Sequence, residues 1–284
     1  MTIRDIINET SQILEAAGIP SARLDAEVIL AFYLKCDRIE FIKNPSNPLS
    51  EDQIAAFQKL LARRLNFEPV AYITGRKAFW SFTLEVNPDV LIPRPDTEVI
   101  VEEALAICRA AALSRPRILD IGTGSGAIAL ALAKEIPDAE IIATDISPAA
   151  LAVAKKNACA LGLENSVSFL QSDLFEKVCG EFDMIVSNPP YIGADEYEAL
   201  EAGVKDFEPQ GALLAGQTGV EFYEKLIYQA HSLLTENGWL LLEIGAKQSE
   251  SVRAIMTANA DYYECIAVRA DYAGLPRVIK GRRK

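Results

Sequence analysis

The sequence predicts an α/β protein in which a small N-terminal helical bundle and a β-hairpin linker precede a doubly wound, mostly parallel sheet of seven strands. Three observations support this fold class. The hydrophobic period is helical over the first 75 residues and changes to strict alternation near residue 82. From residue 117, short apolar runs alternate with helical patterns, which favours a parallel sheet. A glycine-rich loop follows the first of these runs.

Residues 1–75 are expected to form a separate domain of three helices. Helical spacing of apolar residues over Ile3–Ala17 predicts the first helix, which ends before Gly18. We expect Ser21 to cap a second helix that runs to about residue 34. Ser50 and Gln53 form a capping-box pattern for a third helix, which runs to about residue 65.

Residues 76–93 are expected to form the β-hairpin linker, because Phe82, Leu84 and Val86 alternate with polar residues and a turn sequence follows them. Residues 94–284 form the large domain, which begins with a helix near Pro95–Thr97. Helical patterns are expected between the first six of its seven strands. The expected strands are Arg117–Asp120, Glu140–Asp145, Val167–Gln171, Phe182–Asn188, Trp239–Ile244, Tyr262–Val268 and Pro276–Lys280. The last two should pair antiparallel, because the connection between them is too short for a parallel crossover.

Charge and composition exclude several classes of protein. The net charge is −12, with 8 basic and 10 acidic side chains in residues 1–75 and 20 basic and 30 acidic ones after them. Duplex nucleic-acid binders usually need a basic face, so we expect no direct nucleic-acid contact. No apolar run approaches the ~20 residues of a membrane helix, and the N-terminus does not read as a secretory signal.

Five scattered cysteines fit reduced thiols rather than a disulfide framework or a zinc site. The only histidine, His231, is expected to face solvent or to cap a helix, which makes a Ser-His-Asp mechanism or a metal site improbable. We therefore expect a cytoplasmic protein that has no metal and no membrane contact. A monomer is a separate expectation, since these residues do not reveal the oligomeric state.

The glycine-rich loop contains Gly122, Thr123, Gly124, Ser125 and Gly126. Glycines let the backbone approach a ligand closely and adopt φ values that other residues resist. The next strand ends at Asp145, whose carboxylate is placed to accept hydrogen bonds from two ribose hydroxyls. Together, these residues predict a nucleoside cofactor.

Two cofactors fit this loop. Gly122, Gly124 and Ala127 match the loose dinucleotide pattern of NAD-binding proteins. However, Asp120 directly precedes the loop, where an acid disfavours a pyrophosphate and suits the cationic methionyl end of S-adenosylmethionine. Asp173 ends the third strand and is a candidate partner for an adenine amino group, although a loop acid or helix cap explains it equally well.

Asn188-Pro189-Pro190-Tyr191 follows the fourth strand of the large domain. Open α/β sheets bind ligands at this edge. The prolines restrict both Asn188 and Pro189 and bring no N–H groups, so the carbonyls of these two residues are left to accept hydrogen bonds. This geometry suits the binding of a planar NH2 group. A turn that only ends the strand is the alternative interpretation.

Taken in order, Asp120–Gly126, Asp145, Asp173 and Asn188–Tyr191 resemble the motifs of Rossmann-like class I S-adenosylmethionine-dependent methyltransferases of the Asn-Pro-Pro-Tyr type. Pro69–Gly75 and Ile92–Glu98 are similar to segments of the HemK/PrmC family, the release factor glutamine methyltransferases. The resemblance covers nearly the whole chain. One departure is Leu174, because many relatives carry an aromatic residue at this position.

The resemblance implies transfer of a methyl group from S-adenosylmethionine to the side-chain amide nitrogen (N5) of a glutamine. This is the glutamine of the Gly-Gly-Gln motif in class I peptide chain release factors, so the reaction supports translation termination. The by-product is S-adenosylhomocysteine. The N-terminal helical domain has no evident chemistry of its own, so we expect it to recognise the release factor rather than only to help the chain fold.

The resemblance also implies roles for individual residues. Asn188, Pro189 and Tyr191 would be catalytic, and the whole tetrapeptide, with Pro190, would bind the substrate amide. The expected cofactor-binding residues are Gly122, Thr123, Gly124, Ser125, Gly126, Asp145, Asp173, Leu174 and Asn188.

Some alternatives stay open. Arg94 is expected either to contact the acceptor protein or the cofactor, or to pair with Glu98. Rival functions are an adenine-N6 DNA methyltransferase, a binding module that has lost methyl transfer, and an NAD-dependent oxidoreductase.

Overall fold

A computed structural model describes all residues, 1–284, which form two compact units. The first unit comprises Met1–Arg76 together with Glu201–Phe207. The second unit comprises Lys77–Leu200 and Glu208–Lys284. The first unit is therefore not continuous in sequence, a feature that the sequence did not indicate.

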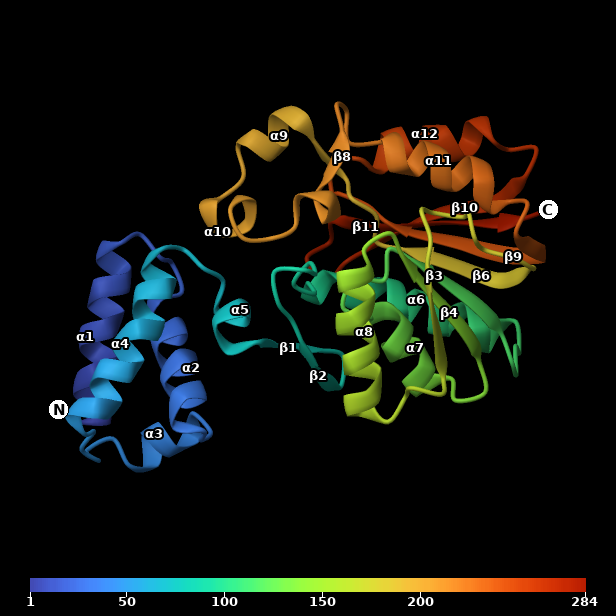
Figure 1. The fold of residues 1–284 in the computed structure, drawn as a ribbon. Helices are drawn as coiled ribbons and strands as arrows, with labels where there is room; N and C mark the ends of the chain where they lie inside the picture. Colours follow the sequence, from blue (N-terminus) through green and yellow to red (C-terminus); the bar gives the residue numbers. More distant parts are fainter. The chain divides into compact units, whose positions relative to one another are not determined.

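The N-terminal helices of the first unit pack around a small apolar core (Figure 1, blue and cyan), and the remaining segment of the unit, with α10, is drawn in orange. Its helices are α1 (Ile3–Ala16), α2 (Ala22–Leu34), α3 (Ile39–Lys43), α4 (Glu51–Leu65), α5 (Val70–Thr74) and α10 (Ala202–Lys205). The three long helices were expected, whereas α3, α5 and α10 were not. Each of these three spans no more than five residues, too few for a helical period to show.

Helix caps account for most of these boundaries. The capping box of Ser50 and Gln53 at the start of α4 is present as expected. Gly18 has a φ of 80° and follows α1 in the left-handed region that glycine tolerates. The expected cap of α2 is wrong, because the Ser21 side chain makes no capping hydrogen bond. The ψ angle of Ser21 is 22°, not the extended value typical of a capping residue.

The second unit is built on a seven-stranded, mostly parallel sheet, as predicted. The strand order is β10-β11-β9-β6-β3-β4-β5. Strands β9, β6, β3, β4 and β5 are parallel, and β11 pairs antiparallel with both β9 and β10. The strands are β3 (Arg117–Ile121), β4 (Glu140–Asp145), β5 (Val167–Gln171), β6 (Phe182–Ser187), β9 (Leu234–Glu243), β10 (Tyr263–Ala270) and β11 (Pro276–Arg283).

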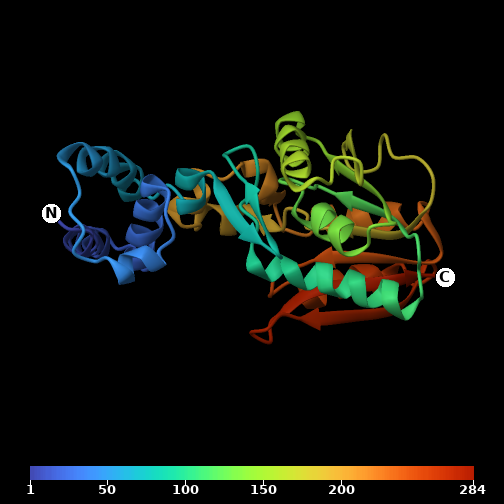
Figure 2. The same ribbon diagram turned by 90° about the horizontal axis from the view of Figure 1, so that it is seen from below.

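Helices cover both faces of this sheet (Figures 1 and 2). Successive strand residues point to opposite faces, so Ile118 and Met184 join one apolar cluster while Leu119 and Ile185 join the other. The first cluster contains residues of α6 (Glu98–Ala110) and α7 (Ala127–Glu135), and α8 (Pro148–Leu161) packs nearby. The second contains residues of α11 (Glu221–Ala230) and α12 (Ser249–Ala258).

The connections differ from the prediction in two places. No helix links β5 to β6; residues 172–181 form turns instead, and two buried side chains, Phe175 and Val178, anchor them. Between β6 and α11 the chain forms a short parallel pair, β7 (Ile192–Gly193) and β8 (Leu214–Gly216), together with helix α9 (Ala194–Glu198) and the short 3-10 helix η2 (Gln210–Ala212). The expected hairpin is present as β1 (Arg76–Phe79) and β2 (Phe82–Glu85).

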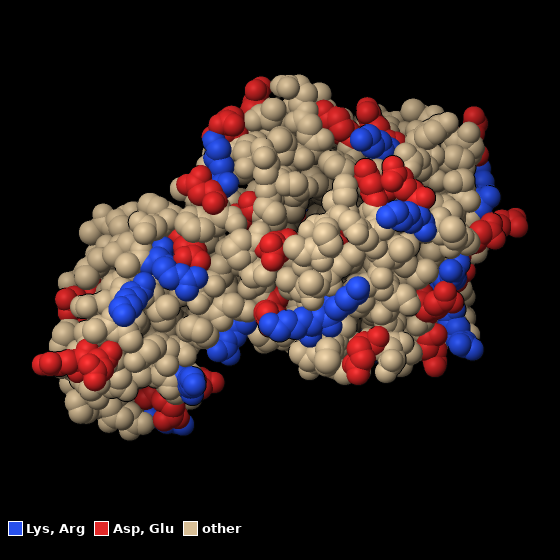
Figure 3. All heavy atoms as spheres, viewed as in Figure 1, with Lys and Arg blue, Asp and Glu red and all other residues tan.

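Other expectations concern single residues and the surface. His231 caps the end of α11, and its ring stacks on Tyr262 at 3.7 Å between centroids. All five cysteines are free. No helix has the length and apolar character that a membrane crossing requires. On the face seen in Figure 3, Lys and Arg are interspersed with Asp and Glu rather than gathered into one basic region.

Candidate functional site

A cavity of about 360 Å³ opens at the carboxyl ends of the parallel strands of the second unit. Its size is in the range typical of small-molecule sites. It lies where β3 has β4 on one side and β6 on the other, the point at which open α/β sheets bind ligands. The lining includes Asp89–Leu91, Pro93, Arg94, Thr97, Ile121–Ser125, Ala127, Ile128, Asp145–Ser147, Ala150, Ser172–Leu174, Ser187–Pro190, Pro209, Gly211, Ala212, Phe222 and Lys225.

The glycine-rich loop links β3 to α7 and forms one wall of this cavity. Gly122, Gly124 and Gly126 have φ values of 71°, 56° and 87°, in the left-handed region that other residues rarely adopt. Gly126 is the N-cap of α7, and a side chain there would meet Leu130 at 3.0 Å. The loop therefore needs its glycines for their backbone conformation, and Gly126 also for space.

Asp120, at the end of β3, holds the glycine-rich loop and the start of α7 by hydrogen bonds. Its Oδ2 accepts hydrogen bonds from the Thr123 hydroxyl at 2.7 Å and from the Ala129 N–H at 3.2 Å. Its Oδ1 is buried without a partner. Burial raises the pKa of Asp120 to about 7, although both hydrogen bonds lower it. A positive group in the adjoining cavity would favour the charged carboxylate.

Asp145 ends β4 and lies in the cavity wall beside the loop. Its carboxylate accepts hydrogen bonds from the Gly124 N–H and the Ser147 N–H, each at 2.9 Å. Burial raises the pKa of Asp145, and these backbone hydrogen bonds oppose the rise. The two bonds fix the carboxylate, and each oxygen keeps a lone pair for a ligand hydroxyl.

Asp173 and Leu174 line the cavity directly after β5. The Asp173 side chain is exposed, so it is free to accept a hydrogen bond from a ligand. Leu174 has a φ of 44°, which is uncommon for a residue with a side chain. The leucine supplies an apolar surface to the cavity wall, without an aromatic ring.

The Asn188–Tyr191 segment contributes its first three residues to the cavity. Pro189 is buried, while Asn188 and Pro190 are half-buried. Tyr191 does not line the cavity; its ring packs against the apolar cluster beneath α11, and burial raises its pKa. The structure therefore brings together every predicted site residue except Tyr191 and Gly126, which lie next to lining residues.

The Asn188 side chain is held by a residue from another part of the chain. Its Nδ2 donates a hydrogen bond to Thr97 Oγ1 at 3.3 Å. Thr97 closes the short helix η1 (Pro95–Thr97) and is only 4% exposed. Burial raises the pKa of Glu243, a residue that is only 1% exposed, to about 7, and the interaction with Thr97 opposes this rise.

Gln248 holds the far end of the tetrapeptide. Its Nε2 donates to the Tyr191 carbonyl at 2.7 Å and to the Gly219 carbonyl at 3.1 Å, and its Oε1 accepts from the Gly245 N–H. The Tyr191 carbonyl is therefore satisfied within the protein. No hydrogen bond from the protein is found on the carbonyls of Asn188 and Pro189, which fits the expectation that they are left for a ligand.

Arg94 pairs with Glu208, so the expected pairing with Glu98 is wrong. Its Nη2 donates to Glu208 Oε1 at 2.5 Å, and Glu208 Oε2 also accepts the Ile92 N–H at 3.1 Å. Glu98 instead accepts the Trp80 N–H at 2.7 Å. Glu208 is buried, so this ion pair fixes the linker segment that lines the cavity.

We expect Arg94→Ala to destabilise the second unit by about 2 kcal/mol, because it removes the partner of a buried carboxylate. Urea unfolding followed by tryptophan fluorescence checks this, since Trp80 and Trp239 both belong to that unit. The control is Lys156→Ala, which lies in the same unit and whose exposed pair with Glu85 should contribute less than about 1 kcal/mol. Equal, small effects of both substitutions would contradict the prediction.

Several site residues could not be found from the sequence. Thr97, Glu208, Glu243 and Gln248 come from four separate segments, and each acts by holding a site residue or a segment of the cavity wall. Glu243 could have been noticed in the sequence, because a charged residue at the end of the apolar run Trp239–Leu242 is unusual. Phe222 and Lys225 of α11 also line the cavity.

The chain is similar to known proteins over its whole length. Two family models match the chain, "PrmC N-terminal domain" over residues 5–75 and "Methyltransferase small domain" over residues 103–214. A methyltransferase structure from Pyrococcus furiosus has a TM-score of 0.53 at 20% identity, covering 79% of this chain and 98% of the other. That likeness shows the fold.

Two relatives with known family names are similar enough to this chain to show the family to which it belongs. A release factor glutamine methyltransferase of Koribacter versatilis is 41% identical over 285 residues, covering 100% of this chain and 99% of the relative. Another, from Salmonella typhimurium, is 45% identical over 263 residues, covering 92% of each chain. The chain therefore belongs to the family of release factor glutamine methyltransferases.

Proposed function

We propose that this protein transfers the methyl group of S-adenosylmethionine to the side-chain amide nitrogen of the glutamine in the Gly-Gly-Gln motif of class I peptide chain release factors. The family membership supports the reaction class and the acceptor protein. One observation of the structure carries the proposal. The glycine loop, Asp145, Asn188 and Pro189 all line a single cavity.

The acceptor nitrogen has to be oriented rather than deprotonated. An amide lone pair is delocalised, which makes the nitrogen a weak nucleophile. In the proposed reaction, Asn188 Oδ1 and the Pro189 carbonyl each accept one N–H of the glutamine amide. The two oxygens also stabilise the positive charge that grows on the nitrogen, an electrostatic effect like that of an oxyanion hole with the signs reversed.

The residues present fit the proposed cofactor. S-adenosylmethionine supplies a methyl group bound to a positively charged sulfur. Asp145 would accept hydrogen bonds from the ribose hydroxyls, Asp173 would contact the adenine amino group, and Leu174 would pack on the base. The buried, unpartnered Oδ1 of Asp120 provides negative potential behind the glycine loop, which suits a cationic ligand better than a pyrophosphate.

The glutamine nitrogen would take the methyl group that the cofactor supplies and give up one proton to solvent, and the cofactor would leave as S-adenosylhomocysteine. Tyr191 stays a predicted catalytic residue. Its place behind the cavity suits support of the tetrapeptide better than direct contact with the amide.

The proposal is tested by incubating the purified protein with S-adenosylmethionine and a bacterial class I release factor, followed by peptide mass spectrometry. We expect one added methyl group on the glutamine of the Gly-Gly-Gln peptide. A release factor in which that glutamine is replaced should gain none. Transfer to DNA but not to the release factor would contradict the proposal. The monomeric state, the cytoplasmic location and the absence of direct nucleic-acid contact stay predictions.

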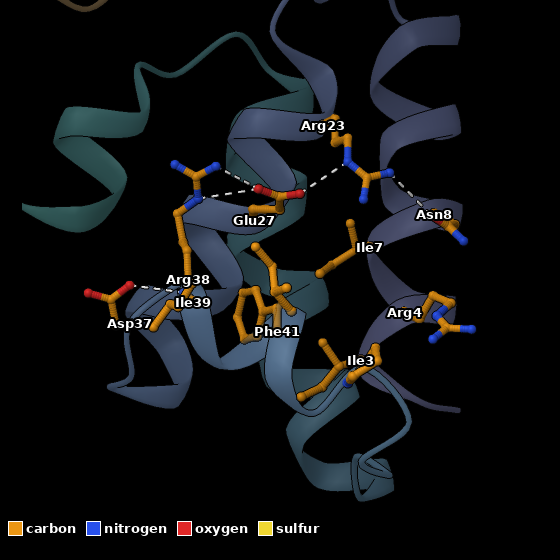
Figure 4. A pocket seen from close by; sticks show the side chains of 12 residues that line it. Ile3, Arg4, Ile7, Asn8, Arg23, Glu27, Asp37, Arg38, Ile39 and Phe41 are labelled. Atoms are coloured by element: carbon orange, nitrogen blue, oxygen red, sulfur yellow. Dashed lines mark hydrogen bonds and ion pairs between the residues drawn. The ribbon is translucent and has the colours of Figure 1, made fainter.

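We further propose that the first unit recognises the release factor. It carries a hollow of about 570 Å³ between α1, α2 and α3 (Figure 4). Ile3, Ile7 and Phe41 form its apolar floor, and Glu27 lies between two arginines at its rim. The "PrmC N-terminal domain" match over residues 5–75 supports a role specific to this family.

Ile42 tests this surface, because it lines the hollow and is 76% exposed. We expect Ile42→Glu to raise the KM for the release factor about tenfold, since burying one such apolar side chain contributes about 1.5–3 kcal/mol. The rate at saturating release factor should stay unchanged. The matched control is Leu24→Glu, which alters a 48% exposed residue of α2 that does not line the hollow. Identical KM values for the two variants would contradict the proposal.

A further inference from the structure

The amide group of Asn188 has two faces of opposite hydrogen-bonding character. Its oxygen accepts hydrogen bonds and its NH2 group donates them. A half turn about the last side-chain bond exchanges these groups, and the proposed reaction works only when the oxygen faces the substrate NH2. If the NH2 group of Asn188 faced the substrate instead, it would meet the NH2 group of the glutamine, and two hydrogen-bond donors would face each other. The protein therefore needs a device that selects one orientation.

Thr97 is placed to make this selection. The distance from Asn188 Nδ2 to Thr97 Oγ1 is 3.3 Å, which assigns the NH2 group to the side of Thr97. A hydroxyl group alone does not fix this assignment, because it can either donate or accept. A second partner that accepts the hydroxyl proton of Thr97 is required.

Glu243 is placed to be that second partner. In the parallel pair of β6 and β9, Ser187 lies opposite Leu242, so Asn188, just beyond β6, lies beside Glu243, the last residue of β9. The Glu243 side chain is 1% exposed, and its Oε2 is buried without a hydrogen-bond partner, so it is available to accept a hydrogen bond from Thr97. Burial raises the pKa of Glu243, and the interaction with Thr97 opposes that rise. An ionised carboxylate only accepts hydrogen bonds, so the Thr97 proton points to Glu243 and its lone pair points to Asn188.

We propose that Thr97 and Glu243 are positioning residues: they hold Asn188 with its amide oxygen toward the acceptor glutamine. This inference rests on the proposed function and adds to it the selection of one amide orientation. It also gives a role to a buried acid that does not itself line the cavity.

The first test compares Thr97→Val with Thr97→Ser. Valine keeps the shape and removes the hydroxyl, which leaves the Asn188 donor without an acceptor. We expect the rate at saturating substrates to fall on the order of 10- to 100-fold, the factor by which an unpaired buried donor is disfavoured. Serine restores the hydroxyl and should restore the rate to within a few-fold. The affinity for S-adenosylmethionine, measured by calorimetry, should change less than threefold in both variants.

The matched control is Thr235→Val. The Thr235 hydroxyl also donates to a carboxylate, that of Asp183, at 3.3 Å, but at the opposite end of β6. Its loss should leave the rate unchanged. A Thr97→Val enzyme with the wild-type rate, or a Thr97→Ser enzyme as slow as Thr97→Val, would overturn the inference.

The pH profile supplies a readout that a purely structural role would not move. Burial raises the pKa of Glu243 to about 7. Below that pH the carboxyl is protonated and donates a hydrogen bond to the Thr97 hydroxyl. The hydroxyl then donates its own proton to the amide oxygen of Asn188, which is no longer available to the substrate. The rate at saturating substrates should therefore fall as the pH drops through about 7, and Glu243→Gln should remove this inflection. The ionisable groups that act on Glu243 from the surrounding segments are Arg94, Asp96, Tyr191, Tyr223 and Arg277.

A spectroscopic measurement separates this inference from the proposed function. The side-chain NH2 signals of Asn188 can be assigned in a ¹⁵N NMR spectrum by their loss in Asn188→Ala. They should shift in Thr97→Val and return in Thr97→Ser, whether or not the protein methylates a release factor. Signals that stay in place in Thr97→Val would overturn the inference, even if the wild-type protein is an active methyltransferase.

Discussion

Asn188→Ala should lower the rate of methyl transfer by on the order of 10²–10³, the cost of losing one preorganised electrostatic contact to the reacting group. The remaining acceptor, the Pro189 carbonyl, cannot hold a planar NH2 group against rotation. Alanine keeps the backbone of the segment, because the restriction of residue 188 comes from the proline that follows it. The affinity for S-adenosylmethionine should change only slightly.

The measurement is single-turnover transfer of labelled methyl groups to the release factor, with the cofactor affinity taken from calorimetry. Asn259→Ala is the matched control, because that asparagine is also partly buried and donates to a backbone carbonyl, Ile255 O, at 2.9 Å. We expect the control to keep the wild-type rate. A near wild-type rate for Asn188→Ala would remove the central residue from the proposed mechanism.

Asp145→Ala should weaken the binding of S-adenosylmethionine by on the order of 100-fold, or about 2.7 kcal/mol, because it removes two charge-assisted hydrogen bonds. The effect also includes some loss of loop order, since the carboxylate accepts the N–H groups of Gly124 and Ser147. Asp145→Asn should lie between the wild type and Asp145→Ala, because it keeps one of the two acceptor oxygens.

Calorimetric titration with S-adenosylmethionine and S-adenosylhomocysteine provides the measurement, since both carry the same ribose. Asp138→Ala is the matched control: Asp138 is an exposed acid that precedes β4, whereas Asp145 ends it. The control should bind both ligands as the wild type does. Unchanged affinity in Asp145→Ala would exclude a ribose contact at this position.

Much of the sheet could be predicted because its signals are local. Each central strand is a short apolar run, and the β10–β11 connection is too short for any pairing but an antiparallel one. The glycine loop could be placed because its positive φ angles demand glycine. The carboxyl ends of parallel strands meet at one edge, which brings Asp145 and Asn188 into the same cavity.

The parts that could not be predicted depend on contacts between distant segments. Nothing near Arg94 in the sequence indicates Glu208 as its partner, whereas Glu98 was the natural choice at helical spacing. The role of Thr97 depends on Asn188 and Glu243, which are remote from it in sequence. The turns between β5 and β6 contain apolar residues that resemble a helix face but instead anchor a loop.

The discontinuity of the first unit has a consequence for the synthesis of the protein. Glu201–Phe207, including α10, packs with Met1–Arg76 to complete that unit. Proteins are made from the N-terminus, and early domains commonly fold while the rest emerges from the ribosome. Here the apolar core of the N-terminal bundle is complete by residue 73, while Glu201–Phe207 can join its surface only after residue 207 has left the exit tunnel. A fragment cut after residue 76 would therefore keep its core and lack only this surface segment.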